Sequence, residues 1–164
     1  MQRQGRPKGR SGQLAGRMQC TARGFGFFVP DDGSEDWYIS QESMHGAMHG
    51  DRVLARRLGS RRGGIEGVET RAWTQIVGTV EGGCVVPDER RIPYVLVPVR
   101  GGRRVSDGDR VVARIEQYPD GRRPMLGRVT EVLGRRGEAG VDVLAVVRRF
   151  GIRDTFPKAV RDAA

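Results

Sequence analysis

Short runs of alternating apolar and polar residues recur along the chain, and turn-forming clusters separate them. In the first half these runs cover residues 14–21, 24–30, 36–40, 52–58 and 65–70. In the second half they cover residues 76–81, 84–87, 94–97, 110–117 and 126–133. The clusters DDGS, SRRGG and PDGRR between them are rich in aspartate and glycine, which favour turns. Each half therefore predicts five short β-strands and no long helix.

Two stretches of the first half return in the second half, in the same order. GDRVLAR at residues 50–56 is followed 58 positions later by GDRVVAR at residues 108–114. FVPDD at residues 28–32 is answered 57 positions later by VVPDE at residues 85–89. The chain is thus predicted to hold two copies of one unit of about 60 residues. An oligonucleotide-binding (OB) barrel has that size and strand number, so we expect an all-β fold of two tandem five-stranded barrels, at residues 14–71 and 72–134.

The two ends of the chain differ from these units. Residues 1–13, MQRQGRPKGRSGQ, carry four basic side chains and no acidic one, which is typical of a disordered basic arm. The stretch GVDVLAVVRRFG at residues 140–151 predicts a short helix, with Asp142 as its cap and Gly151 just after its end. A second helix is expected from Pro157. We interpret residues 135–164 as a linker and helical segment that leads to a domain absent from this chain.

The charge of the chain favours a polyanionic partner. Lys and Arg number 29 against 20 Asp and Glu, which gives a net charge of +9, and 27 of the 29 basic residues are arginine. The guanidinium group binds phosphate with a planar fork and stacks on bases, although a GC-rich genome also raises the arginine content. No apolar run approaches the length of a membrane helix, and the basic start lacks the apolar segment of a signal peptide. We expect a cytoplasmic protein with no membrane partner.

The stretch RGFGFFV at residues 23–29 places three of the chain's ten aromatic residues within four positions. On a strand, Phe25 and Phe27 share one face and Phe28 points to the other. We assign the face of Phe25 and Phe27 to the surface, because glycines flank the two rings and an arginine precedes them. In this interpretation the two rings can stack on unpaired bases. In the alternative interpretation both phenylalanines are part of the core.

The next predicted strand, DWYIS at residues 36–40, extends this surface. If Trp37 and Ile39 point inward, Tyr38 lies outward beside the two phenylalanines. Arg17 and Arg23 are close in sequence to the same strand and are candidates for phosphate contacts. The alternative is that these arginines are ordinary solvated charges.

RGFGFFV and DWYIS resemble the two ribonucleoprotein motifs of cold-shock domains, with arginine at position 23 in place of the usual lysine. Three further features belong to the same resemblance: HGDRV at residues 49–53, the degenerate second copy, and GVDVLAVVRRFGIRDTFP at residues 140–157. With these motifs, residues 14–164 resemble the N-terminal region of ribonuclease R-like enzymes of the ribonuclease II family. That family consists of processive 3′→5′ exoribonucleases with two N-terminal cold-shock barrels, a magnesium-dependent catalytic domain and an S1 barrel.

The resemblance implies single-stranded RNA as the partner, with the ribosome or other RNA-processing proteins as further candidates. It implies stacking roles for Phe25, Phe27 and Tyr38 and a backbone contact for Arg23. Magnesium is expected only in the catalytic domain that this chain lacks. A gapless match puts Met18 where cold-shock proteins have a stacking tryptophan and Ser40 where many have histidine. Both departures predict weaker binding of single strands than in a free cold-shock protein.

The second copy lacks the rings. The repeat offsets put Gly82 and Cys84 at the positions of Phe25 and Phe27, and Leu96 at the position of Tyr38. Its loops are instead rich in arginine, at positions 90, 91, 100, 103, 104, 122 and 123. One hypothesis gives Arg103 and Arg104 phosphate contacts, so that the first unit stacks bases and the second follows the backbone. The other makes the second unit a structural spacer.

We find no catalytic or metal-binding pattern in the sequence. The densest carboxylate group is Asp31, Asp32, Glu35 and Asp36, in a stretch typical of a strand connection. His45 and His49 are four positions apart, but glycines follow both and no third ligand is evident. Cys20 and Cys84, the only cysteines, form no CxxC pair. We therefore expect no catalytic residue, metal or cofactor in this chain.

These observations predict an RNA-binding module that captures single strands and feeds them to a catalytic domain. Two other functions stay open: a stand-alone cold-shock-like RNA-binding protein or RNA chaperone, and an arginine-rich module that docks an acidic protein.

Overall fold

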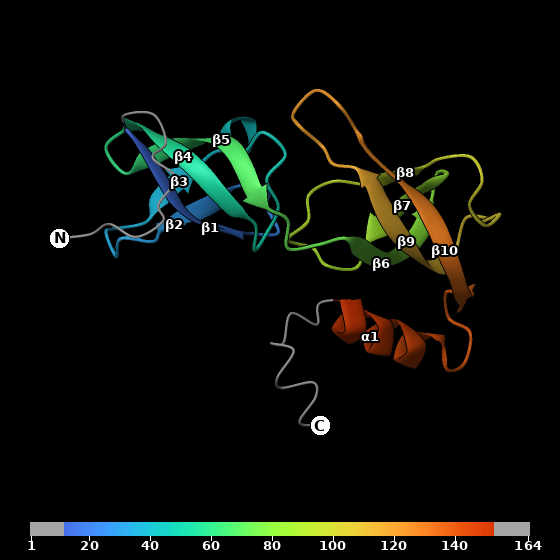
Figure 1. Cartoon of the computed structure of the whole chain (residues 1–164). Coiled ribbons are helices and arrows are strands. Elements are labelled where there is room, and N and C mark those ends of the chain that lie inside the picture. Colours follow the sequence, from blue (N-terminus) through green and yellow to red (C-terminus); the bar gives the residue numbers. More distant parts are fainter. Residues whose placement is uncertain (1–11, 153–164) are drawn as a thin grey trace, which may run out of the picture. The chain divides into compact units, whose positions relative to one another are not determined.

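The computed structural model describes residues 12–152, which form two compact units (Figure 1). The first unit contains the described residues up to Ala72 together with Arg90–Tyr94 and Tyr118–Pro124. The second contains Trp73–Glu89, Val95–Gln117 and the described residues from Met125 onward. The predictions for residues 1–11 of the arm and for a helix from Pro157 lie outside the described residues.

The first unit is built around a closed five-stranded barrel. Its strands are β1 (Gln13–Cys20), β2 (Gly26–Pro30), β3 (Trp37–Ile39), β4 (Arg52–Gly59) and β5 (Arg62–Thr70), with the 3₁₀ helix η1 (Gln41–Ser43) after β3. They close in the order β1-β2-β3-β5-β4, and only the β3–β5 pairing among them is parallel. The interior holds Met18, Phe28, Trp37, Ile39, Met44, Val53, Ala55 and Ile65.

The second barrel repeats this arrangement. Its strands are β6 (Gln75–Glu81), β7 (Cys84–Pro87), β8 (Leu96–Pro98), β9 (Asp109–Gln117) and β10 (Met125–Arg135). They close as β10-β8-β7-β6-β9. Read around the closed barrel from β6, this is β6-β7-β8-β10-β9, the same order as β1-β2-β3-β5-β4 in the first barrel. The pairing between β8 and β10 is parallel, as is that between β3 and β5. The predicted all-β fold of two five-stranded barrels is therefore confirmed.

Within each barrel, the two repeated sequence stretches contact each other. In the first barrel, Arg52 of GDRV donates to Asp31 of FVPDD over 2.9 Å. In the second, Arg110 donates to Asp88 over 2.6 and 2.8 Å. The repeat has thus kept both partners of one ion pair, which joins the end of the second strand to the start of the fourth.

The aspartate of GDRV also has the same role in both barrels. Asp51 accepts a hydrogen bond from the backbone N–H of Met48, and Asp109 accepts one from the N–H of Ser106, both over 2.9 Å. The preceding glycine has φ of 89° at Gly50 and 95° at Gly108, a conformation that favours glycine. The motif therefore closes the turn that leads into the fourth strand of each barrel.

Helix α1 (Val141–Ile152) packs on the outside of the second barrel. Val141 and Ala145 are buried with Val77, Val112 and Leu133, which are side chains of β6, β9 and β10. This contact explains why β6 is buried at five successive positions, from 76 to 80. The predicted helix is confirmed, with two corrections: Asp142 lies in its first turn rather than at its cap, and position 151 lies inside it.

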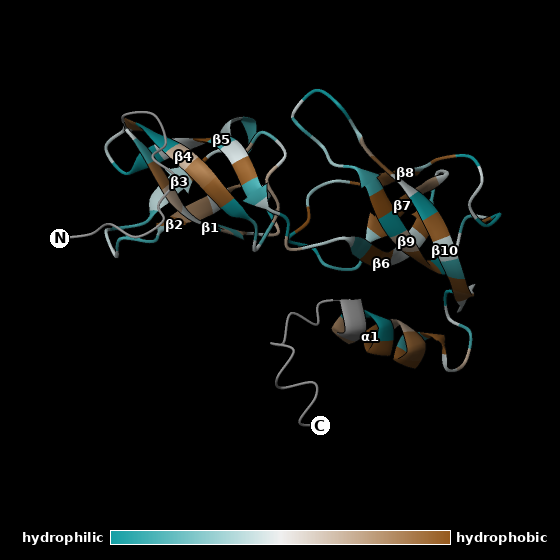
Figure 2. Cartoon of the chain, in the orientation of Figure 1, coloured by the Kyte–Doolittle hydropathy of each residue, from teal (hydrophilic) through white to brown (hydrophobic). Residues whose placement is uncertain are grey.

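Two ion pairs support the helix on the barrel. Arg148 donates two hydrogen bonds of 2.9 Å to Glu131, and a guanidinium nitrogen of Arg149 lies 3.6 Å from Glu89. Large apolar residues on the other side of α1 remain exposed, and much of the α1 ribbon is brown in Figure 2. No helix among residues 12–152 is long and apolar enough to cross a membrane.

Candidate nucleic-acid interface

Three aromatic rings meet on the outer surface of the first barrel. Phe27 of β2 and Tyr38 of β3 are direct cross-strand partners, and each is 38% exposed. Phe25, just before β2, is half-buried, with its ring centroid 5.9 Å from that of Phe27 and 5.5 Å from that of Tyr38. We call these three residues the aromatic cluster.

The predicted orientation of these strands is confirmed. Phe28, Trp37 and Ile39 are at most 2% exposed, and the ring centroids of Phe28 and Trp37 lie 5.0 Å apart in the interior. The alternation of the two strands therefore separates a buried aromatic pair from the aromatic cluster outside.

The loop before β2 holds Phe25 in place. The backbone carbonyl of Phe25 accepts hydrogen bonds from the N–H of Thr21, over 2.9 Å, and from its hydroxyl, over 3.0 Å. Gly24 has φ of 98°, and a Cβ there would lie 3.1 Å from the side chain of Gln41. The glycine between Arg23 and Phe25 is thus favoured by the backbone turn and by the close approach of Gln41.

A row of four outward positions crosses the barrel at right angles to its strands. Gln19 of β1 pairs with Phe27, Phe27 with Tyr38, and Tyr38 with Arg62 of β5. Gln19 and Arg62 are both exposed. The row therefore presents, in order, an amide, two rings and a guanidinium group.

The row corrects one equivalence drawn from the sequence. Met18 has no exposed surface and packs in the core beside Phe28, its partner in the β1–β2 pairing. The residue of β1 that lies beside the aromatic cluster is Gln19, so Met18 does not occupy a surface position next to the rings. Ser40, the second departure from cold-shock domains, caps η1: its hydroxyl accepts the N–H of Ser43 over 3.3 Å.

Arginines near the aromatic cluster differ in how they are paired. Arg17 and Arg23 are exposed, and within residues 12–152 no ion pair engages either of them or Arg62. By contrast, Arg52 and Arg61 are held by carboxylates. The unpaired guanidinium groups are therefore those of Arg17 and Arg23, the two candidates from the sequence, and of Arg62. The sequence analysis missed Arg62 because it assigned SRRGG to a turn.

The second barrel has aliphatic side chains where the first has rings. Val85 pairs with Leu96 inside the barrel, and both have no exposed surface. This pair corresponds to Phe28 and Trp37, so the equivalence of Leu96 with Tyr38 is wrong. Val97 follows Leu96 at the outward position and is half-buried. The second barrel still has no ring at the positions of the aromatic cluster.

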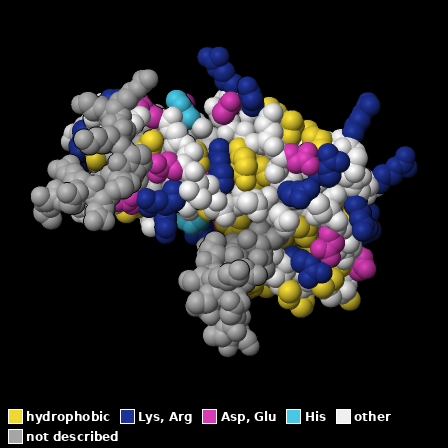
Figure 3. All heavy atoms as spheres, viewed as in Figure 1, with side chains coloured by type: hydrophobic (Ala, Val, Ile, Leu, Met, Phe, Trp, Pro, Cys, Tyr) yellow, Lys and Arg dark blue, Asp and Glu magenta, His cyan; other side chains and the backbone are white. Residues whose placement is uncertain are grey.

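Only some of the predicted arginines of the second copy belong to the second unit. The segments that carry positions 90, 91, 122 and 123 are part of the first unit. Arg103 and Arg104 are exposed on the segment after β8, where the backbone N–H of Arg103 donates to Val129 over 3.0 Å. Figure 3 shows basic side chains interspersed with acidic ones on the visible surface rather than gathered in one patch.

Three of the four carboxylates and one of the two histidines singled out in the sequence have structural partners. Asp31 and Glu35 are paired with arginines, and Asp32 accepts hydrogen bonds from the N–H and hydroxyl of Ser34. His49 accepts the N–H of Cys20 through Nδ1 over 3.1 Å. Across the described part of the chain, no group of three or more His, Cys, Asp or Glu side chains is arranged to hold a metal ion.

Cys20 is a buried thiol of the core. It is 5% exposed, its Sγ lies 3.6 Å from Sδ of Met44, and burial raises its pKa to about 12, with a further contribution from Asp51. A thiol with so high a pKa is not a nucleophile near neutral pH.

Known protein families match both halves of the chain. Residues 16–71 match the ribonuclease B OB domain, and residues 85–157 match a cold shock domain. The ribonuclease R of Acidithiobacillus ferrooxidans is 38% identical over 159 residues, which cover 90% of this chain and 36% of that protein. Over 90% of its length, the chain is therefore similar to part of ribonuclease R. Its two halves match an OB domain and a cold shock domain in tandem, which agrees with the resemblance drawn from the sequence motifs.

Other relatives agree with this assignment. The ribonuclease R of Escherichia coli K12 is 36% identical over 150 residues, which cover 84% of this chain and 18% of that protein. The chain thus spans about a third or less of these ribonuclease R relatives. Mycoplasma genitalium RNase R, solved in complex with ribose-methylated single-stranded RNA, superposes with a TM-score of 0.69 at 17% identity, over 82% of this chain and 23% of that one. Yeast Ssd1, a pseudonuclease, gives 0.70 at 13% identity, over 84% and 25%. At these identities the structures show a shared fold.

Proposed function

We propose that this chain is a single-stranded RNA-binding region of a ribonuclease R-like protein, and that its aromatic cluster stacks on unpaired bases. The observation that carries the proposal is the pair Phe27 and Tyr38, which are cross-strand partners with rings open to solvent on a barrel whose inward rings are buried. Exposed aromatic rings next to unpaired cations have the chemistry that single-stranded nucleic acid requires.

The energetics of the aromatic cluster agree with this role. Stacking of one base on an aromatic side chain contributes about 1–3 kcal/mol. The three ring centroids lie within 6.1 Å of one another, so neighbouring bases of one strand could use them together. Arg17 and Arg23 would neutralise the phosphates that flank these bases, which makes binding sensitive to salt. Duplex RNA keeps its bases stacked inside the helix and offers no such faces.

We propose further that the captured strand is passed to a magnesium-dependent catalytic domain. The exposed side of α1 supports this role, because its large apolar residues remain 40–73% exposed: Val143, Leu144, Val146, Val147 and Phe150. A contiguous apolar surface of this kind usually packs against another protein surface. The ribonuclease R relatives are several times longer than the region matched, so a further domain of such a chain is the natural partner for this side of the helix.

The proposal is tested by titrating the chain with labelled single-stranded and duplex RNA at two salt concentrations. The double substitution Phe25→Ala/Phe27→Ala should weaken single-strand binding by about 2 kcal/mol or more, roughly 30-fold, since two stacking surfaces are removed. Phe150→Ala is the matched control, because it removes a phenylalanine that is 73% exposed on α1. Unchanged affinity of the double variant would leave only charge as a basis for binding and would reject the stacking role.

The role of Arg103 and Arg104 needs a separate measurement. If both contact phosphates of a bound strand, Arg103→Gln/Arg104→Gln should reduce the slope of log affinity against log salt by about 1.4, since each contact on a single strand contributes about 0.7. Arg136→Gln is a control, because this guanidinium is also largely exposed, at 67%, but lies 3.9 Å from Glu81. An unchanged slope would favour a structural role for the second barrel.

A further inference from the structure

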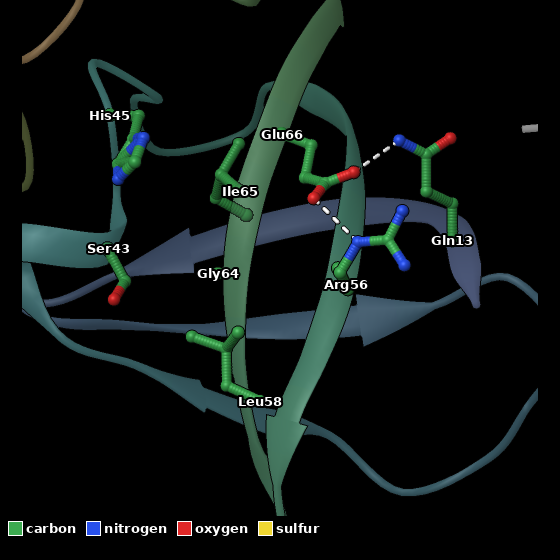
Figure 4. A pocket seen from close by; sticks show the side chains of 8 residues that line it. All are labelled: Gln13, Ser43, His45, Arg56, Leu58, Gly64, Ile65 and Glu66. Carbon is green, nitrogen blue, oxygen red and sulfur yellow. Dashed lines mark hydrogen bonds and ion pairs between the residues drawn. The ribbon is translucent and has the colours of Figure 1, made fainter. Parts of the chain in front are cut away.

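A hollow of about 510 Å³ lies on the first barrel, on the side formed by β4 and β5 (Figure 4). The strands contribute Arg56, Leu58 and Gly64–Glu66, η1 contributes Ser43, and His45 follows in the loop after η1. Gln13 at the start of β1 completes the lining. In Figure 4 Gly64 carries no side chain, Ser43 lies to one side of it and Leu58 lies below it.

This hollow lies next to the Arg62 end of the row of outward positions, in the direction of β5. Tyr38 pairs with Arg62 of β5, and the next residue of β5 on the same face is Gly64. Two residues of a strand span roughly 7 Å, which is comparable to the step between neighbouring nucleotides of an extended strand. A chain of nucleotides that leaves Tyr38 along β5 therefore reaches Gly64 one step beyond Arg62.

The lining suits an uncharged planar group better than a phosphate. Arg56 Nε donates to Glu66 over 2.7 Å, and the amide of Gln13 donates to the same carboxylate, so this part of the wall carries no excess charge. Leu58 is 61% exposed and supplies an apolar surface. These features match a nucleobase, which needs an apolar face and polar groups at its edge.

The polar groups on the other side of the hollow are available for such an edge. Over residues 12–152, the hydroxyl of Ser43 and the imidazole of His45 make no hydrogen bond. His45 also has φ of 49°, a left-handed backbone conformation that is uncommon for residues other than glycine. Both groups can donate or accept a hydrogen bond.

We propose that the hollow is a further subsite for an unpaired nucleotide of the same RNA strand. The base would lie against Leu58 over the bare backbone of Gly64, with Ser43 and His45 at its edge. Arg62 would hold the phosphate between this nucleotide and the one stacked on Tyr38. The inference rests on the proposed RNA-binding function and extends the binding surface from the aromatic cluster around the barrel.

The test compares unlabelled oligoadenylates of three and six nucleotides by NMR titration of the 164-residue chain. The trinucleotide is long enough for the aromatic cluster, and the hexanucleotide also reaches the hollow. Gly64→Val fills the hollow: a Cβ at this position lies 3.2 Å from Cδ1 of Leu58, the movable end of an exposed side chain. Gly67→Val is the matched control on the same strand, because a Cβ there meets no atom within 4 Å.

Gly64→Val should weaken hexanucleotide binding by about fivefold or more and change trinucleotide binding by less than twofold, as expected when one base contact is lost. Leu58→Ser should have the same selective effect without any change in β5. Addition of the hexanucleotide, but not of the trinucleotide, should shift the imidazole resonances of His45. The control Gly67→Val should bind both oligonucleotides as the wild type does.

Two results would overturn the subsite: unchanged hexanucleotide affinity in both variants, or equal losses for the two lengths. The proposed function fails in a different way. If Phe25→Ala/Phe27→Ala kept its affinity while Gly64→Val lost affinity for the hexanucleotide, the stacking role would be rejected and the hollow would stand as a binding site. If the wild type bound neither oligonucleotide, both proposals would be rejected together.

Discussion

The ion pair repeated in the two barrels allows the effect of burial on its strength to be tested, because the more exposed pair of the first barrel serves as the reference for the more buried pair of the second. Arg110 and Asp88 have side chains that are 12% and 16% exposed, whereas those of Arg52 and Asp31 are 35% and 36% exposed. Removal of one partner leaves the other charge unpaired, and the cost rises as the remaining charge loses contact with water. Asp88→Asn should therefore destabilise the second barrel more than Asp31→Asn destabilises the first.

The expected magnitudes follow from these exposures. Breaking a fully buried pair costs about 3–5 kcal/mol, and an exposed pair contributes about 0–1 kcal/mol. Arg110 retains a small exposed fraction and a 2.9 Å hydrogen bond to Oγ1 of Thr79, which reduce the cost, but its buried Nε has no hydrogen-bond partner in the described part of the chain. We expect a loss of about 2 kcal/mol for Asp88→Asn and less than about 1 kcal/mol for Asp31→Asn.

The two tryptophans of the chain allow each unit to be followed separately, because Trp37 belongs to the first and Trp73 to the second. Urea titrations monitored by the two indole N–H resonances give one midpoint for each unit. Asp88→Asn should lower the midpoint reported by Trp73 by the larger amount. Equal shifts for the two variants, or a larger shift for Asp31→Asn at Trp37, would show that burial does not set the strength of this pair.

Three further outcomes follow from the packing. Phe28→Ala, at a position with no exposed surface, should cost the first barrel about 3–5 kcal/mol in urea unfolding, and Phe27→Ala less than about 1.5 kcal/mol; equal losses would contradict the assigned faces. Gly16→Ala should cost about 1–3 kcal/mol in the same assay, since its Cβ would lie 2.2 Å from the carbonyl oxygen of Val29, and a neutral effect would refute the close approach. The hydrogen bonds from Arg148 lower the pKa of Glu131 below its usual 4.5, so this contact should stabilise α1 above pH 4.5 and weaken as the pH falls through the lowered pKa. Amide exchange of α1 should therefore become faster over that range of falling pH, and Glu131→Gln should remove this pH dependence.

Local patterns in the sequence were sufficient for the strands and for the sides they present. The alternation in GFFVP and WYI assigns Phe28 and Trp37 to the interior and Phe27 and Tyr38 to the surface, because side chains of a strand alternate without any help from the rest of the fold. The repeated GDRV motif likewise identified two copies of one barrel.

Positions that depend on pairing between distant strands could not be obtained in this way. The register of β1 against β2 decides that Gln19, and not Met18, lies beside the rings. The parallel pairing of β3 with β5 brings Arg62 next to Tyr38, across 24 residues of sequence. In the second barrel, Val85 and Leu96 are two residues further apart in sequence than Phe28 and Trp37, which is one residue more than the repeat offsets allow for. Leu96 therefore lies in the core and not at the surface position expected for it. Loop lengths set these registers, and a shift of one residue reverses the side that each residue faces.

By itself, the sequence determined the two-barrel architecture, the strand that carries the rings, and a positive charge suited to a polyanion, because these depend on composition and on the two-residue period of a strand. Only the tertiary structure decided which arginines remain unpaired, which amide joins the row of rings, and that a hollow lies over Gly64, beside the end of that row. Those properties depend on which residues far apart in the chain become neighbours on a closed barrel, and the spacing of residues along the sequence does not determine these neighbours.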